Sequence, residues 1–250
     1  MFWCHINEEF NCIYKRFCLF VEDNSVNYLY LEVYQPDNMT KAILFDFWGT
    51  LVENGVWSPI KQVKKILEIK LPFPEYVVRM EKAMMTSKFN NLKEAFENVC
   101  KEFNLEINND KIDSLVGMWN KSWMLAQPYQ EIKEILTELR KNNQIILVSN
   151  TDCFSIKQVM EKFNLDELFD KVFLSCEIGM IKTDQNFFKH VLTDLNLTTD
   201  DATMVGDSIQ SDIMAAKRMD MKAVLIDRRN TRDYHPKIKS LNELSRVLEM

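Results

Sequence analysis

Short apolar runs that end in polar or turn-forming residues recur along the chain, with amphipathic stretches between them. Ala42–Phe45 is an apolar run with the length of a core strand, and it is too short for a helix. Comparable runs lie at Ile145–Val148, Val172–Leu174, Thr203–Val205 and Ala223–Ile226. Strands that alternate with helical stretches are typical of a parallel sheet. The pattern therefore predicts an α/β fold, in which five parallel strands wrapped by helices form a Rossmann-like core.

The helices of this core are expected to alternate with the strands. They are predicted over Tyr129–Lys141, up to Phe163, over Asp184–Leu195, over Ile209–Arg218 and over Leu241–Leu248. Two of them have the residues of a capping box at their start, Ser155 with Gln158 and Ser240 with Glu243.

The segment from Gly55 to Gln127 has a different character, with helical periodicity and little clustering of β-branched residues. Ser58-Pro59 supplies an N-cap followed by proline, and Asn91 with Glu94 resembles a capping box. The predicted helices are Pro59–Ile69, Pro74–Lys88, Leu92–Phe103 and Lys111–Met124. The chain is thus expected to comprise a core domain of residues 39–54 and 128–250 and an inserted helical domain of residues 55–127.

Residues 1–38 fit neither domain and are expected to form an N-terminal extension. They contain nine aromatic residues and three of the six cysteines, with no helix-forming core pattern. Asn24–Leu31 could pair as a short extra strand. We expect this extension to be poorly ordered or to lie upstream of the true start, since Met39 stands just ahead of the first core strand.

Chemically active residues follow the predicted strands. Asp46 ends the first apolar run, Ser149-Asn150 ends the second, and Asp207 follows Thr203–Val205, with Asp212 five residues further on. Lys182 lies in a turn ahead of a predicted helix. In an open α/β sheet, ligands bind at the carboxyl ends of the strands. An acid, a hydroxyl, a lysine and an acid pair at that edge form a charge-balanced site for a phosphoryl group and a divalent cation.

These segments resemble the four motifs of the haloacid dehalogenase-like hydrolase superfamily, over Lys41 to about Met250. Its first motif, D-x-D-x-T, matches Asp46–Thr50 except at Trp48, and its second motif matches Ile145–Ser149. Its third motif matches Lys182, and the fourth, G-D-S-x-x-x-D-I, matches Gly206–Ile213 throughout. One such match is weak, but four in order at suitable spacing are a specific signal.

The resemblance implies a phosphatase that acts through an aspartyl-phosphate on Asp46. Mg²⁺ prefers hard oxygen ligands, and the implied ligands are Asp46, Asp207 and the backbone carbonyl of Trp48. Ser149, Asn150 and Lys182 would bind the phosphate, with Ser149 and Lys182 assisting catalysis. Asp212 would hold a metal-bound water or orient Lys182. The alternative is that Asp212 has no role in the site and only stabilises a helix N-terminus, whose dipole favours a negative charge.

Trp48 departs from the family pattern at the position of the usual general acid. General acid–base help is worth about 10²–10⁴-fold, so its loss would weaken turnover without abolishing it. Three readings remain open: a phosphatase in which water or another acid such as Glu53 takes over, a phosphonatase-like or dehalogenase-like hydrolase, or a phosphate-binding module. The intact acids Asp207 and Asp212 argue against a dehalogenase, because dehalogenases work without a metal.

The helical insertion resembles the type 1 cap of the superfamily, a lid whose side chains would select the substrate. Candidates that could reach the site from this segment are Arg79, Lys82, Lys88, Trp119 and Trp123.

Composition limits the partners of the protein. A net charge of −6 provides no basic field for nucleic acid, and no apolar run approaches the roughly 20 residues of a membrane span. Six cysteines without framework spacing predict a reduced, cytoplasmic protein. The expected partner is a small phosphorylated substrate, with no nucleic acid and no membrane, and the protein is expected to be a monomer or homodimer.

Overall fold

The computed structural model describes residues 18–22, 25–29 and 41–248, and the chain divides into two compact units, Met1–Met39 and Thr40–Met250. In the first unit, β1 (Cys18–Glu22) and β2 (Ser25–Leu29) pair as an antiparallel hairpin in which Glu22 lies opposite Ser25. The strand expected over Asn24–Leu31 is thus found over Ser25–Leu29. Asn24 and residues 30–31 lie outside the described residues.

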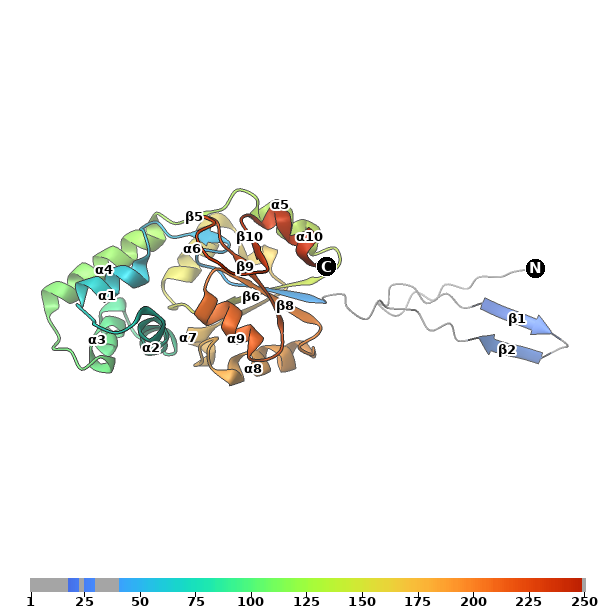
Figure 1. The fold of residues 1–250 in the computed structure, drawn as a ribbon, viewed down its shortest axis with the longest axis horizontal. Coiled ribbons are helices and arrows are strands. Elements are labelled where there is room, and N and C mark those ends of the chain that lie inside the picture. Colours follow the sequence, from blue (N-terminus) through green and yellow to red (C-terminus); the bar gives the residue numbers. More distant parts are fainter. Residues whose placement is uncertain (1–17, 23–24, 30–40, 249–250) are drawn as a thin grey trace. The chain divides into compact units, whose positions relative to one another are not determined.

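The second unit is built on a six-stranded sheet (Figure 1) with the order β10-β9-β8-β3-β6-β7. Every neighbouring pair is parallel. The strands are β3 (Ala42–Phe45), β6 (Gln144–Ser149), β7 (Lys171–Leu174), β8 (Ala202–Gly206), β9 (Lys222–Ile226) and β10 (Lys237–Ile238). The predicted α/β class is confirmed, but the predicted number of five strands is wrong. β10 has only two residues, which is too short for a hydrophobic pattern to reveal.

The strands are buried on both faces because helices cover the sheet from both sides. Ile43 and Phe45 of β3 pack into one hydrophobic cluster with residues of α5 (Ile132–Leu139), α6 (Ser155–Phe163) and α10 (Leu244–Leu248). Ala42 and Leu44 point to the opposite face, toward α8 (Gln185–Leu195) and α9 (Met214–Lys217). Alternate strand residues face opposite sides of a sheet, so a fully apolar strand implies two covered faces.

Four helices lie between β4 (Val52–Glu53) and β5 (Gln127–Pro128), two short strands that pair antiparallel. They are α1 (Pro59–Ile66), α2 (Phe73–Met85), α3 (Leu92–Glu102) and α4 (Asn109–Met124), drawn cyan to green in Figure 1. All four predicted helices are found, with ends that differ by up to three residues. They pack around a hydrophobic cluster of their own. That residues 55–127 act as a separate domain stays a prediction.

Some local predictions need correction. Ser240 and Glu243 form the expected capping box ahead of η3 (Leu241–Glu243) and α10. Ser155 and Gln158 do not form one, because Asp152 accepts hydrogen bonds from the backbone N–H of Phe154 and Ser155 instead.

The segment after β8 also differs from the continuous helix predicted there. It begins as a π-helical turn, η2 (Ile209–Ile213), before α9. Shorter elements that were not predicted are η1 (Asp166–Leu168) and α7 (Ser175–Ile178).

Cys153 and Cys176 form a disulfide with a Cα–Cα distance of 5.8 Å. The prediction of fully reduced cysteines is therefore wrong at this pair. The two cysteines follow β6 and β7, which are neighbours in the sheet, so their juxtaposition depends on strand order and not on spacing in the sequence. Within the described parts of the chain, no helix has both the length and the apolar character needed to cross a membrane.

Candidate active site

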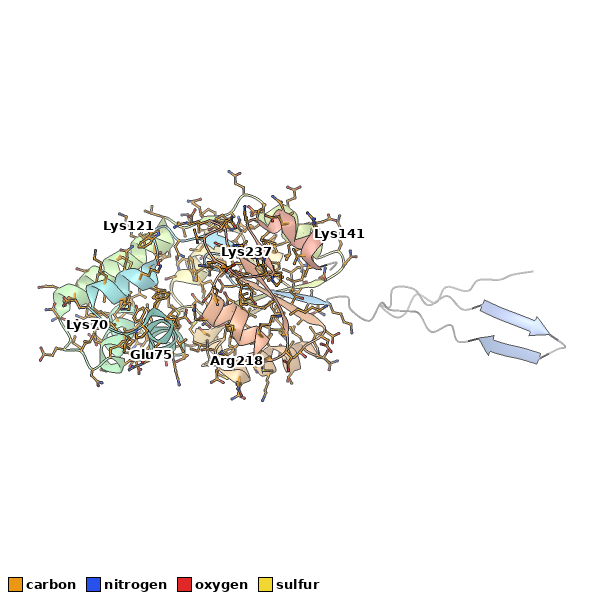
Figure 2. The ribbon with its side chains drawn as sticks, in the orientation of Figure 1. Lys70, Glu75, Lys121, Lys141, Arg218 and Lys237 are labelled. Carbon is orange, nitrogen blue, oxygen red and sulfur yellow. A yellow bond between two sulfur atoms is a disulfide. The ribbon has the colours of Figure 1, made fainter. Side chains whose placement is uncertain are left out.

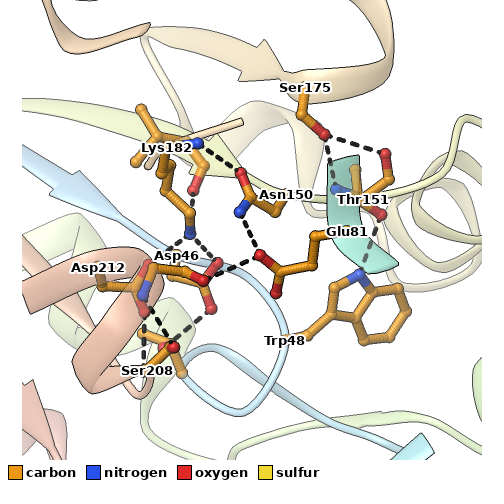
Figure 3. A network of polar contacts seen from close by, with 12 residues as sticks. Asp46, Trp48, Glu81, Asn150, Thr151, Ser175, Lys182, Ser208 and Asp212 are labelled. Atoms are coloured by element: carbon orange, nitrogen blue, oxygen red, sulfur yellow. Dashed lines mark hydrogen bonds and ion pairs between the residues drawn. The ribbon is translucent and has the colours of Figure 1, made fainter. Parts of the chain in front are cut away.

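Asp46 and Lys182 meet at the carboxyl edge of the sheet, although 136 residues separate them in the sequence. Lys182 Nζ lies 2.5 Å from Asp46 Oδ1 and 2.5 Å from Asp212 Oδ1. Thr50 donates a hydrogen bond of 3.3 Å to the other oxygen of Asp46. Figure 3 shows Lys182 reaching the two acids from above. The strand-end acid, the loop lysine and Asp212 are thus brought together as the sequence predicts.

A group of three acids could hold a metal ion here. Asp46, Asp207 and Asp212 each offer a carboxylate oxygen, and these oxygens lie within 4.8 Å of one another. Two glycines make this approach possible. A Cβ on Gly49, which has a φ of +79°, would lie 2.7 Å from Asp207 Oδ2. A Cβ on Gly206 would lie 2.2 Å from Asp212 Oδ2.

The crowding of these acids perturbs their protonation. Burial raises the pKa of Asp46 to about 6, with Lys182 opposing the rise and Asp212 adding to it. Burial together with Asp46 and Asp212 also raises the pKa of Asp207, although 34% of its side chain remains exposed. Burial alone would lower the pKa of Lys182, but Asp212 and Asp46 more than offset this effect and raise it. The three carboxylates thus face only two positive charges, those of Lys182 and of Arg232 beside Asp207, and this excess of negative charge fits a site for a cation.

The two phosphate-binding residues predicted at the end of β6 differ in their surroundings. Ser149 is fully buried, and its hydroxyl has no hydrogen-bond partner among the described residues. The Asn150 side chain is engaged on both sides. It accepts a hydrogen bond of 2.8 Å from the Lys182 backbone N–H and donates one of 2.8 Å to Glu81. Asn150 lines the cavity above the site, whereas Ser149 is not among the lining residues.

Trp48 lines the cavity together with Asp46. Its indole N–H donates a hydrogen bond of 3.1 Å to Thr151 Oγ1, and its ring meets that of Phe47 edge to face. Its only polar hydrogen is therefore committed to Thr151, so the side chain at this position has no proton to offer a leaving group.

The cavity has a volume of about 920 Å³ and lies between the helical segment and the carboxyl edge of the sheet. Sequence reasoning missed the arginines that line it, Arg228, Arg229 and Arg232, which follow β9. Arg232 contacts Asp207, and the Arg228 guanidinium stacks 3.5 Å above the Tyr129 ring. Their position after a strand was the available signal, since the loops that follow parallel strands surround the site.

Only some of the candidates from the helical segment lie at the cavity. Trp119 and Trp123 line the cavity, and Trp119 donates a hydrogen bond of 2.8 Å to Asp152. Arg79 instead pairs with Glu102, and neither Lys82 nor Lys88 lines the cavity. Glu81 of α2 also comes from this segment, and it accepts hydrogen bonds from Asn150 and Ser211 at the site. The sequence did not single it out as a candidate.

The chain belongs to the haloacid dehalogenase-like hydrolase family, whose sequence profile matches residues 43–226. A glyceraldehyde 3-phosphate phosphatase of Methanocaldococcus jannaschii is 28% identical over 197 residues, which are 75% of this chain and 85% of the relative. An N-acylneuraminate-9-phosphatase of Rattus norvegicus is 23% identical over 201 residues, which are 74% of this chain and 81% of the relative.

Solved structures agree with the fold. A HAD phosphatase from Thermococcus onnurineus has a TM-score of 0.56 at 23% identity and covers 84% of this chain and 98% of its own. A HAD family enzyme from Bacteroides thetaiotaomicron, solved in complex with magnesium and inorganic phosphate, has a TM-score of 0.53 at 19% identity. It covers 78% of this chain and 98% of its own. At these identities the likeness shows the fold alone.

Proposed function

We propose that the protein is a Mg²⁺-dependent phosphatase of a small phosphorylated metabolite, with Asp46 as the nucleophile. The observation that carries the proposal is the placement of Asp46. The residue is 6% exposed and lines the cavity, and its carboxylate is held by Lys182 at 2.5 Å, next to two further acids. A buried carboxylate held in one orientation at a cavity wall suits attack on a substrate bound there.

In the proposed reaction, Asp46 attacks the substrate phosphorus and forms an aspartyl-phosphate, which water then hydrolyses. Lys182 holds the attacking carboxylate, and its positive charge offsets the negative charge of the phosphate group. The hydroxyl of Ser149 has no partner among the described residues and would donate to a phosphate oxygen once its side chain turns toward the cavity, which it does not line. Asp212 keeps Lys182 charged and oriented through their ion pair.

The donor set fits Mg²⁺. Asp46, Asp207 and the backbone carbonyl of Trp48 would hold the ion, which prefers one or two carboxylates together with phosphate oxygens and water. Bound there, it would neutralise charge between the two anions that must approach each other. The pKa of Asp46 is raised by the protein groups around it, as expected for a cluster of acids with room for a further positive charge.

The relatives narrow the substrate class. Both relatives described above are named as phosphatases of small phosphorylated metabolites, glyceraldehyde 3-phosphate in one and an N-acylneuraminate 9-phosphate in the other. We extend that class, a phosphate monoester of a small carbon skeleton, to this chain. A cavity of about 920 Å³ lined by arginines and tryptophans has room for a substrate of this size.

A panel of phosphorylated metabolites tests the proposal, with phosphate release measured in Mg²⁺ and in a chelator. The panel includes glyceraldehyde 3-phosphate, N-acylneuraminate 9-phosphate and p-nitrophenyl phosphate. We expect release that requires Mg²⁺ for at least one member. Metal-independent chloride release from a 2-haloacid would establish a dehalogenase instead, and tight phosphate binding without any turnover would establish a binding module.

A further inference from the structure

One stripe of α2 faces the cavity and contains a single acid. Phe73, Val77, Glu81 and Met85 all line the cavity, and they follow one another at intervals of four residues. Residues at this spacing lie on one face of a helix. Three members of the stripe are apolar, as expected for a helix that packs against the rest of the protein. Glu81, a residue that is 9% exposed, breaks the pattern with a carboxyl group.

The contacts of Glu81 connect it to the nucleophile. Its Oε2 accepts hydrogen bonds from Asn150 Nδ2 at 2.8 Å and from Ser211 Oγ at 2.9 Å. The same Asn150 side chain accepts from the backbone of Lys182, whose Nζ holds Asp46. Figure 3 shows this chain of contacts, with Glu81 facing Asn150. Oε1 accepts no hydrogen bond from any described residue, so one oxygen of the carboxyl group remains available to the cavity.

The surroundings of Glu81 favour a group that can both give and take a proton. Burial raises its pKa to about 7, while the hydrogen bonds from Asn150 and Ser211 oppose the rise. The charged groups that act on it are Lys182, which also lowers the pKa, and Asp212, which raises it. A general acid or base works best when its pKa lies near the operating pH.

We propose that Glu81 of the helical segment is the general acid and base of this active site, in the role that Trp48 cannot fill. The inference rests on the proposed phosphatase function and adds a catalytic residue to it. The first motif contributes the nucleophile but no proton-transfer group, which comes instead from a helix 35 residues further along the chain than Asp46. The helix would then have a chemical role beyond selecting the substrate.

The proton balance of the two steps is complete without a further reactant. In the first step, Asp46 forms a bond to phosphorus, the ester P–O bond breaks, and the leaving oxygen takes the proton of the Glu81 carboxyl group. In the second step, the Glu81 carboxylate takes a proton from water as the water oxygen attacks phosphorus. The bond between phosphorus and Asp46 then breaks, which restores the Asp46 carboxylate and the protonated Glu81.

The plain alternative is that Glu81 only fastens α2 to the core through Asn150 and Ser211. The two roles differ in how they depend on the leaving group. An acid matters most when the leaving oxygen is strongly basic, whereas a structural contact affects every substrate alike. Glu81→Gln is the suitable variant, because the amide keeps the shape and an oxygen acceptor but cannot transfer a proton.

The experiment compares single-turnover release of the leaving group in wild type and Glu81→Gln. One substrate is glyceraldehyde 3-phosphate, or another alkyl phosphate of the panel that the wild type hydrolyses, and the other is p-nitrophenyl phosphate. We expect release from the alkyl phosphate to fall by about 10²–10⁴-fold. The p-nitrophenolate burst should stay within a few-fold of wild type and be followed by slow turnover, because the second step has lost its base. Equal losses in both first steps, or no loss in either, would overturn the proposal.

Two further variants keep the test decisive. Glu75→Gln, at an exposed position of the same helix (Figure 2), is the matched control and should behave as wild type. Trp48→Asp in the Glu81→Gln background should recover part of the lost alkyl-ester activity, because it returns an acid to the site. Absence of any recovery, when the double variant folds, would favour the structural role.

Ser211→Ala covers the case in which Glu81→Gln does not fold. It removes one contact to Glu81 but keeps the carboxyl group. The hydrogen bond from Ser211 lowers the pKa of Glu81, so the proposal predicts that the Glu81 limb of the pH–rate profile for alkyl phosphate hydrolysis moves to higher pH in Ser211→Ala. A profile with the limbs of the wild type would contradict it, because a purely structural contact does not set the pH dependence.

Failure of this inference is distinguishable from failure of the proposed function. A wild type that hydrolyses no phosphate ester refutes the function itself. A wild type that is active, with an inactive Asp46→Asn and an unaffected Glu81→Gln, refutes only the role of Glu81.

Discussion

Lys182 lies between two carboxylates in a nearly dry environment, with its side chain 2% exposed and Asp46 and Asp212 at 2.5 Å each. Taking such charges out of water is costly, and removing one partner of a buried ion pair typically destabilises a protein by about 3–5 kcal/mol. An arrangement that is expensive for folding and lies at a cavity wall is better explained by chemistry than by stability.

Trp48→Asp tests whether the tryptophan stands where an acid would act. The new carboxyl group should raise the hydrolysis rate most for alkyl phosphates, whose leaving oxygen is the most basic, and least for acyl phosphates. The expected gain is smaller than the full 10²–10⁴-fold of a general acid if Glu81 already performs this step. Steady-state rates on both substrate types measure the effect, and equal changes on the two would show that position 48 does not face the leaving group.

Asp207→Asn should raise the Mg²⁺ concentration needed for half-maximal activity by about tenfold or more, because one charged ligand is lost. Metal titrations of activity and calorimetry provide the measurement. Asp113→Asn, which changes an exposed acid on α4, is the control and should leave the Mg²⁺ requirement unchanged. An unaltered requirement in Asp207→Asn would show that Asp207 is not a metal ligand.

At the scale of elements, the turn from β8 into η2 sets the distance between Gly206 and Asp212. A Cβ on residue 206 would lie 2.2 Å from Asp212 Oδ2, so Gly206→Ala must displace that carboxylate or the turn. We expect a loss of stability of about 1–3 kcal/mol, as for overpacking, together with reduced activity.

Gly117→Ala is the matched control. Residue 117 lies inside α4, and apart from its chain neighbours and the backbone of its own helix no atom lies within 4 Å of the added Cβ, so helix propensity should stabilise the protein by about 0.5–1 kcal/mol. Chemical denaturation measures both variants. A Gly206→Ala protein as stable and active as wild type would contradict the steric argument.

The elements also show what a sequence reveals and what it does not. The strands β3, β6, β7, β8 and β9 and the residues at their ends were predictable, because a parallel sheet buried on both faces leaves continuous apolar runs and brings strand ends together. Asp46, Lys182, Asp207 and Asp212 converge for that reason.

Glu81 could not be placed in the same way, because its partners lie 69 and 130 residues away on other elements. Only its position in an apolar stripe of α2 signalled that it faces inward. The Cys153–Cys176 disulfide likewise depends on the order of strands in the sheet, which local patterns do not specify.

At the scale of the molecule, residues 1–38 are expected to be dispensable for activity. The site is built from residues of the second unit, and β3 lies between β8 and β6 in its sheet. A chain that begins at Met39 should fold, melt within a few degrees of the full-length protein and keep its activity. Thermal melts and phosphate release test this, and a large drop in melting temperature would show that the extension is part of the folded domain.

The central claim is that Asp46 forms a covalent phosphoryl intermediate. The most direct measurement is an acid quench within the first turnover, followed by mass spectrometry of the peptide that contains Asp46. We predict a phosphoryl group on that peptide in the wild type. Asp46→Asn should fold normally and show neither the phosphoryl group nor turnover, because the amide keeps the shape but loses the nucleophile. Near wild-type turnover in Asp46→Asn, with no phosphorylated peptide in the wild type, would contradict the account.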